Sequence, residues 1–410
     1  MAERHRSIEL LSGDLGCTLT AMDIVKEKIR QTPALLQELD LDLWLVFVRE
    51  TPVLADPILP LVVGLDATWQ SFFAFTRSGE AIALIGNLDK ADYERSGRFT
   101  DVLPYTAGVK EDIRSLLQRL DPRRIALNYS PDDPSADGLT HGMYLLLCDY
   151  LAGTPYAGRL VSAETLCSKL RARKTVSEVA RLTTAAELAN QVWLDALDQL
   201  KVGMSEREIA AVIEKKMADS GGQTSFETIV NAGSKTEPGH GRPTDARLEP
   251  GDLLHIDFGV RSDGYCSDLQ RLLYFRRRGE TDVPNELQEA FATVKDIISE
   301  TAKRCRPGVR GWEIDAAARK MLTDHGYPEY EHGLGHQLGR SVHDGGALLG
   351  PKWERYGKTP TLEVEASYVF TLELEIMLAG IGCVGLEEDI VVTEHGGRFL
   401  CPRQLELVVK

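Results

Sequence analysis

The chain has 410 residues, of which 43% are hydrophobic and 27% are charged, and its formal net charge at pH 7 is −15. This length predicts two domains, each able to bury a core. The acidic charge argues against a nucleic-acid partner, because binding phosphates requires a concentrated field of lysine and arginine. No apolar stretch reaches the roughly 20 residues of a membrane span, and the first residues resemble no signal peptide. We therefore expect no membrane partner and a cytoplasmic protein.

The first 165 residues alternate between helix and strand patterns. Helical spacing over 22–39 leads into the apolar strand "LWLVFV" (43–48), and "FFAFTRSGEAIALIG" (72–86) predicts a hairpin that turns at Ser78-Gly79. A polar and basic segment over 161–176 follows. We therefore predict an α/β domain over 1–165 and a second domain over 166–410.

The second part begins with an amphipathic helix near Ser177 and contains an internal repeat. The segments 202–222 and 307–327 align without gaps at an offset of 105 residues, and each is a helix that follows a glycine. Two copies at this spacing favour an α+β domain with pseudo-two-fold symmetry over a solenoid. A chance match between two amphipathic helices is the alternative.

Two predicted hairpins carry acidic residues. In 252–275 a four-residue turn over 261–264 would place Asp257 directly opposite Asp268. In 367–394 a turn over 379–381 would place Glu373 opposite Glu387, on the face away from the apolar residues of the strand. Like charges that face each other destabilise a sheet, whereas bound cations would convert the repulsion into coordination. Solvated acids on the protein surface are the alternative, and the presence of two matching pairs argues against it.

Three histidines and five glycines occupy the fifteen residues "HGLGHQLGRSVHDGG" (332–346). Glycine allows a backbone to approach a ligand closely, so this segment could be a binding loop. Taken alone, it could equally be a solvated loop with incidental imidazoles.

The order of these motifs resembles the pita-bread metallopeptidases, a family that includes methionine aminopeptidase, aminopeptidase P and Xaa-Pro dipeptidase (prolidase). The likeness is strongest to the Xaa-Pro dipeptidase and creatinase-like branch, over about 170–410. It implies an α+β fold class, with a C-terminal pita-bread domain behind a smaller α/β creatinase-type domain, to which 61–86 is more weakly similar.

The resemblance also implies a site and a reaction. The implied function is hydrolysis of a small peptide amide by a metal-bridging hydroxide, with two divalent ions, manganese first and cobalt, iron or zinc as alternatives. The metal ligands that it implies are Asp257, Asp268, His336, Glu373 and Glu387. The catalytic residues that it implies are Glu373 as proton acceptor and His240, His332 and His343 on the substrate side. Members of this branch commonly form homodimers, which we expect here.

Several residues depart from the pattern of the family. Gln270 and Leu272 replace two threonines, Leu374 and Glu375 replace a proline and a glycine, and Gly385 replaces an arginine. The local field is therefore more negative than in relatives. We expect weak activity on standard Xaa-Pro dipeptides, and some recovery of that activity on the substitution Gly385→Arg.

Two other functions stay open at this point. The chain could be a pita-bread enzyme that acts on a non-peptide small molecule, as creatinase, ectoine hydrolase and dimethylsulfoniopropionate lyase do. It could also be a catalytically silent binding protein, although retention of all five ligand positions argues against this.

Overall fold

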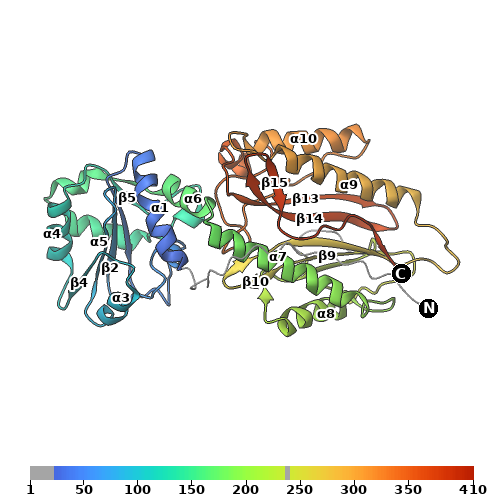
Figure 1. Ribbon diagram of the computed structural model, residues 1–410, viewed down its shortest axis with the longest axis horizontal. Helices are drawn as coiled ribbons and strands as arrows, with labels where there is room; N and C mark the ends of the chain where they lie inside the picture. Colours follow the sequence, from blue (N-terminus) through green and yellow to red (C-terminus); the bar gives the residue numbers. More distant parts are fainter. Residues whose placement is uncertain (1–22, 236–240) are drawn as a thin grey trace, which may run out of the picture.

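A computed structural model of the protein describes residues 23–235 and 241–410. Two bodies of helix and sheet lie next to each other along the longest axis, and the chain passes between them at α6 and α7 (Figure 1). Among the described residues, no helix combines the length and the apolar character that crossing a bilayer would require.

The N-terminal body is a six-stranded sheet with helices on both faces. Its strands have the order β4-β3-β2-β1-β5-β6. They are β1 (Leu43–Val48), β2 (Ser71–Thr76), β3 (Ala81–Gly86), β4 (Asp101–Tyr105), β5 (Ile125–Leu127) and β6 (Leu160–Ser162). The helices are α1 (Ile24–Glu38), α2 (Leu59–Val62), α3 (Lys90–Ser96), α4 (Lys110–Leu120), α5 (His141–Leu151) and α6 (Glu164–Ala172), with 3-10 turns η1 (Pro134–Ala136) and η2 (Pro155–Arg159).

The apolar run of β1 is explained by this layered arrangement. All six of its residues are buried, and alternate side chains enter two different cores. Trp44 and Val46 pack in the core that contains residues of α1, whereas Leu43 and Leu45 pack in the core that contains residues of α4 and α5. A strand covered on both faces is expected to read as a continuous hydrophobic run. The predicted hairpin at Ser78-Gly79 is confirmed, since Phe75 pairs with Ala81.

The C-terminal body is a curved sheet between two pairs of helices. In Figure 1, α9 and α10 lie on one side of β13 and β14, and α7 and α8 lie on the other side of the sheet. The helices are α7 (Val176–Leu197), α8 (Glu206–Asp219), α9 (Asn285–Arg304) and α10 (Gly311–Asp324), with 3-10 turns η3 (Glu354–Tyr356) and η4 (Thr359–Thr361). The last strand of the first sheet ends at Ser162 and α7 begins at Val176, and the domain boundary at 165/166 stays a prediction.

The main sheet of this body has seven strands, and a smaller sheet has three. The main order is β13-β14-β12-β9-β8, with β15 added to β14 and β16 added to β12, and the smaller order is β11-β10-β7. The strands are β7 (Gln223–Thr224), β8 (Ile229–Ala232), β9 (Leu253–Phe258), β10 (Val260–Ser262), β11 (Tyr265–Cys266), β12 (Leu269–Tyr274), β13 (Val369–Leu378), β14 (Gly382–Thr393), β15 (Gly396–Phe399) and β16 (Val408–Val409).

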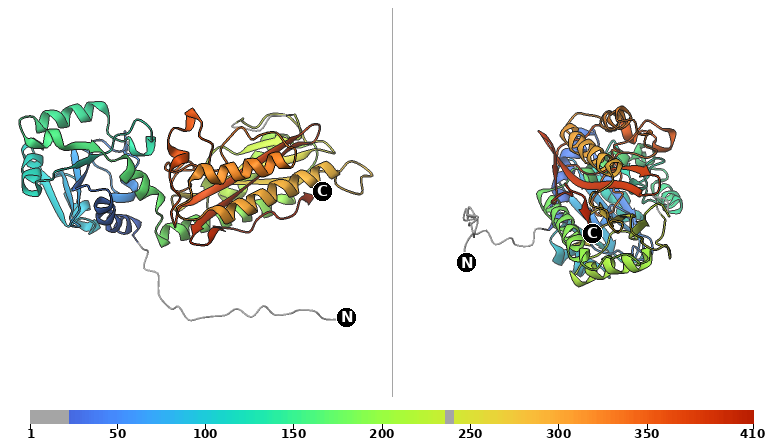
Figure 2. Two further views of the ribbon diagram at one scale, coloured as in Figure 1. Left: turned by 90° about the horizontal axis from the view of Figure 1, so that it is seen from above. Right: turned by 90° about the vertical axis from the view of Figure 1, so that its right-hand side faces the viewer.

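The internal repeat corresponds to two equivalent helices. Both α8 and α10 have 14 residues, and each starts with a glutamate in its first turn that accepts a hydrogen bond from the backbone N–H three residues earlier, at Ser205 and Arg310. This is the acidic half of a capping box. Helix α9 packs against α10 and runs beside it in Figure 2. The repeat is therefore a structural one.

Candidate metal centre

The first acidic hairpin turns more tightly than the sequence predicted. Ser262 pairs with Tyr265, so only Asp263 and Gly264 form the loop, and both have positive φ, 48° and 78°. Asp-Gly with two positive φ angles is the preferred two-residue type I′ hairpin turn, because its twist matches that of the strands. The expected four-residue turn is therefore wrong.

This tighter turn changes the partner of Asp257. Gln270, and not Asp268, lies directly opposite Asp257 on β12, so the predicted pairing of the two aspartates is incorrect by two residues. Because side chains on a strand alternate with a period of two, a shift of two residues keeps Asp268 on the same face. The two carboxylates are therefore diagonal neighbours, and they still face the same side of the sheet.

The second acidic hairpin has the predicted register. Leu378 pairs with Gly382 across a three-residue loop, and Glu373 lies directly opposite Glu387. Glu387 is in turn opposite Gln270. A single row of paired positions thus crosses four adjacent strands, and its members are Asp257, Gln270, Glu387 and Glu373.

The loop that contains His336 is fixed to the edge of this sheet. The backbone N–H of Thr371 on β13 donates to the carbonyl of His336 at 2.9 Å, and the N–H of His336 donates to the Thr371 hydroxyl at 3.2 Å. Gly335 is required here, since a Cβ at this position would lie 2.0 Å from the Thr371 carbonyl oxygen. His336 Nε2 consequently lies 3.6 Å from Asp268 Oδ2, and the ring of His343 is 4.4 Å away, centroid to centroid.

A cavity of about 1080 Å³ lies over this face of the sheet. The side chains of His332 and His343 lie on its exposed wall, whereas His336 is partly buried. The five residues predicted as metal ligands all line the cavity, namely Asp257, Asp268, His336, Glu373 and Glu387. Ligand atoms of Asp268, His336 and Glu387 come within 4.8 Å of one another. His240 lies outside the residues that the structure describes.

Burial and mutual repulsion make these carboxyl groups hard to ionise. Burial raises the pKa of Asp257 to about 7 and, with the repulsion from Asp257, that of Glu373 to about 8. Burial and neighbouring carboxylates raise the pKa of Asp268 and of Glu387 well above the usual range. An opposite charge has the reverse effect on a carboxyl group, so the cluster lacks a compensating cation from the described part of the protein.

Unpaired oxygen atoms show that the cluster fits divalent metal ions. Asp257 Oδ1, Asp268 Oδ1 and Glu387 Oε1 are buried, and they accept no hydrogen bond from any residue within 23–235 or 241–410. Buried polar atoms in native proteins are normally satisfied, so three orphaned oxygens on one face indicate a partner beyond the residues that the structure describes. Carboxylate and imidazole donors suit manganese, iron, cobalt or zinc. We call the four acids Asp257, Asp268, Glu373 and Glu387 the carboxylate cluster.

A buried amide connects this cluster to a histidine that the sequence did not indicate. Gln270 Nε2 donates to Glu387 Oε2 at 3.1 Å, and Gln270 Oε1 lies 3.0 Å from His255 Nε2. His255 Nδ1 lies 3.0 Å from the side-chain oxygen of Asn231. The sequence marked Gln270 only as a departure from the family, whereas the correct register of the first hairpin would have placed it within the acidic row.

This arrangement also overturns the expected effect of Gly385→Arg. A Cβ at position 385 would lie 2.6 Å from Gln270 Oε1 and 2.7 Å from His255 Nε2. The amide and the imidazole therefore occupy the space into which a longer side chain would extend. An arginine at this position would displace them, and we no longer expect it to restore activity.

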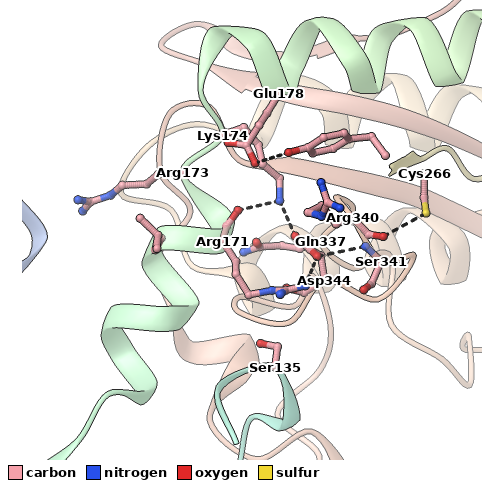
Figure 3. Close-up of polar contacts among 12 residues, drawn as sticks. Ser135, Arg171, Arg173, Lys174, Glu178, Cys266, Gln337, Arg340, Ser341 and Asp344 are labelled. Atoms are coloured by element: carbon pink, nitrogen blue, oxygen red, sulfur yellow. Dashed lines mark hydrogen bonds and ion pairs between the residues drawn. The ribbon is translucent and has the colours of Figure 1, made fainter. Parts of the chain in front are cut away.

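A second buried charged cluster anchors the segment that contains His343. The next residue, Asp344, accepts hydrogen bonds from Arg171 at 2.5 Å and from Lys174 at 2.6 Å (Figure 3). Burial alone would raise the pKa of Asp344, but Lys174 and Arg171 together hold it below its usual value. Arg171 also donates to the carbonyl of Pro57 in the N-terminal body, at 2.9 Å.

The same cluster extends to the first helix. Lys28 on α1 forms a fully buried ion pair with Glu178 on α7 at 2.7 Å, and Tyr265 donates to Glu178 at 3.1 Å. We call this set the junction cluster, and its members are Lys28, Arg171, Lys174, Glu178 and Asp344. It joins the two bodies next to the cavity.

Comparison with known proteins gives concordant results. The family model described as "Metallopeptidase family M24" matches residues 180–394. An Xaa-Pro dipeptidase of Pyrococcus horikoshii is 31% identical over 242 residues, which are 58% of this chain and 65% of that protein. The matched region thus spans somewhat less than two thirds of this relative. An uncharacterized peptidase of Bacillus subtilis, YqhT, is 31% identical over 67% of this chain and 73% of its own length.

Solved structures agree in fold. An Xaa-Pro dipeptidase from Bacillus anthracis superposes with a TM-score of 0.73 at 23% identity, over 94% of this chain and 100% of that one. At this identity the likeness concerns the fold alone. It covers both bodies, as expected for the pita-bread domain and its creatinase-like N-terminal domain. With the family model matching more than half of its residues, the chain belongs to metallopeptidase family M24.

Proposed function

We propose that this protein is a metal-dependent hydrolase that cleaves an amide bond of a small peptide, in the manner of its Xaa-Pro dipeptidase relatives. The observation that carries the proposal is the carboxylate cluster, because three of its buried oxygens have no donor among the described residues. The residues that would hold two divalent ions are Asp257, Asp268, His336, Glu373 and Glu387. We propose manganese as the metal.

Ions bound there would supply a water that is deprotonated near neutral pH and would polarise the amide carbonyl. The protein supplies the proton transfers. Glu373 lines the cavity and is partly exposed to it, so its carboxylate can accept a proton from a water beside the ions. His343 lies beside His336 on the exposed wall, where it can donate a hydrogen bond to the substrate.

His332 and His240 complete the proposed substrate side of the site. His332 lines the cavity and is exposed, and it can contact the part of the peptide that is distant from the sheet. The role of His240 follows from the motif resemblance. We further propose a homodimer, which light scattering at micromolar and nanomolar protein would test.

Metal analysis and a panel of Xaa-Pro dipeptides test the proposed function together. The purified full chain should bind two manganese ions per subunit, and chelation should abolish hydrolysis. We expect weak turnover of standard Xaa-Pro dipeptides. Glu375 adds a negative charge beside the ligands, and Gly385 stands where the family pattern has a positive arginine. A kcat/KM of about 10⁴–10⁸ M⁻¹s⁻¹ on these dipeptides would overturn the expected weakness.

A specific observation keeps a second candidate function in view. Gly385 and Gln270 depart from the family pattern and contact each other and His255 beside the ligands, which favours a non-peptide small molecule as the alternative substrate. Including such compounds in the panel distinguishes the candidates. Metal-dependent turnover of these compounds alone would favour the second function over the first.

A further inference from the structure

Glu375 adds a fifth carboxylate to the cavity beside the metal centre. It lies on β13 two residues after Glu373, so both side chains point to the same face of the sheet. Glu375 lines the cavity and is partly exposed to it. Among the described residues its carboxylate accepts one hydrogen bond, from the thiol of Cys383 at 3.5 Å, and a thiol is a weak donor.

The protein provides no cation for Glu375 among the residues that the structure describes. Within 23–235 and 241–410, neither lysine nor arginine forms an ion pair with Glu375 or with any member of the carboxylate cluster. His336 Nε2 lies 3.6 Å from Asp268 Oδ2, and this imidazole is a cation only when it is protonated.

The basic side chains that line the cavity are directed elsewhere. Lys358 pairs with Asp132 at 3.3 Å, and Arg340 lies 5.5 Å above the ring of Tyr265. Arg355 donates to a backbone carbonyl on the exposed wall, and Arg261 is exposed on β10. The floor of the cavity is thus acidic, and the lysine and arginine side chains that line the cavity lie on its walls.

The position opposite Glu375 cannot supply a charge either. Its cross-strand partner is Gly385, and the space above Gly385 is filled by the side chains of Gln270 and His255. Two divalent ions balance the four charges of the carboxylate cluster and leave that of Glu375 uncompensated. A positive group must therefore come from the molecule that enters the cavity.

We propose that Glu375 is a specificity-determining residue that binds an ammonium group of the substrate. This inference rests on the proposed function, since it names the charge of the substrate at the same site. Two sources share this chemistry. The first is the free α-ammonium of a peptide cleaved at its first bond, whose nitrogen is about 2.5 Å from the scissile carbonyl carbon. The second is a basic side chain on the first residue.

Matched substrates distinguish these two sources in the metal-loaded full chain. One pair compares a free dipeptide with its N-acetyl form, and a second pair compares a first residue of lysine with one of norleucine. Glu375→Gln should raise KM for the cationic member of the relevant pair about 10–100-fold, the range for a lost charged hydrogen bond, and should leave kcat nearly unchanged. Glu354→Gln is the matched control, because Glu354 lines the same cavity from η3.

Binding measurements give a readout that does not depend on turnover. The amino alcohol leucinol has an ammonium and no scissile bond, and calorimetry should show that Glu375→Gln weakens its binding 10–100-fold relative to N-acetylleucinol. If the protein hydrolyses no amide but still shows this effect, the proposed function fails and the ammonium site stands. Equal leucinol binding by both proteins would overturn the inference. Loss of one metal ion in Glu375→Gln would also overturn it, by making Glu375 a ligand.

Discussion

The carboxylate cluster and the junction cluster are both buried groups of charged side chains, but their charges are arranged in opposite ways. In the junction cluster, Asp344 has two cations within 2.6 Å, and its pKa is lowered despite burial. In the carboxylate cluster, the pKa values of all four acids are raised. Folding alone accounts for a cluster in which each acid is paired with a basic side chain. A cluster of like charges needs cations that the described residues do not supply, and this difference separates a structural site from a candidate functional one.

The largest effect should come from removing one acid of the carboxylate cluster. Glu373→Gln should lower kcat by roughly 10²–10⁴, the range for a lost proton-transfer group. The metal-free variant should be no less stable than the metal-free parent, because a repelling charge has been removed. Steady-state kinetics and thermal unfolding measure the two quantities. A stability loss in the metal-free state would show that Glu373 has a structural role like that of Asp344.

Breaking the junction cluster should have the reverse signature. Asp344→Asn leaves Arg171 and Lys174 buried without a counter-charge, and breaking a buried pair costs about 3–5 kcal/mol of unfolding free energy. Asp324→Asn is the control, because its ion pair with Lys320 is exposed and should contribute under about 1 kcal/mol. Urea denaturation measures both. Equal midpoints for the two variants would remove the distinction between the clusters.

The pH dependence of the metal-free protein should separate the clusters further. The pKa values of Asp257 and Glu373 are raised to about 7 and about 8, so their contribution to stability is complete below about pH 4 and is lost as pH rises to 8. The pKa of Asp344 is lowered, so its contribution is present above about pH 4 and is lost on further acidification.

Thermal scans of the chelated protein test this sign. Between pH 5 and pH 8 the Tm should fall by roughly 5 °C, and manganese added at pH 8 should restore it. A Tm that rises over this interval without metal would mean that the buried acids are already compensated by the protein.

The smallest effect concerns the packing beside the carboxylate cluster. Gly385→Ala forces a methyl group against Gln270 and His255, and overpacking of this kind costs about 1–3 kcal/mol. Gly142→Ala is the matched control, since Gly142 on α5 has free space around it and should gain about 0.4–1 kcal/mol. If Gly385→Ala is neutral and improves hydrolysis of Xaa-Pro dipeptides, the site has room for a longer side chain and Gly385→Arg should restore activity.

The sequence predicted most of the secondary structure that forms the site, because local patterns specify it. The apolar strand β1, the hairpin at 379–381 and the repeated helices follow from periodicity and turn residues. The register of the first hairpin does not follow from its pattern alone, because a four-residue turn over 261–264 and the two-residue Asp263-Gly264 turn both fit the sequence.

Contacts between distant segments could not be predicted in this way. Arg171 and Asp344 are 173 residues apart, and neither residue lies in a motif that indicates a buried ion pair. The contact between Gln270 and His255 depends on the absence of a side chain at Gly385, which comes from another strand. Such contacts follow from the assembled sheet and not from any one segment of it.

The repeat that contains α8 and α10 divides the C-terminal body into two halves, and each half supplies part of the proposed metal site. Asp257 and Asp268 come from the half that contains α8, whereas His336, Glu373 and Glu387 come from the half that contains α10. The exposed loop over 276–279 lies between the two halves. Proteolytic cleavage in this loop would produce two fragments, and neither fragment would contain the full set of metal ligands. Such a split protein would act as a complementation system, in which recovered activity reports on reassociation of the fragments.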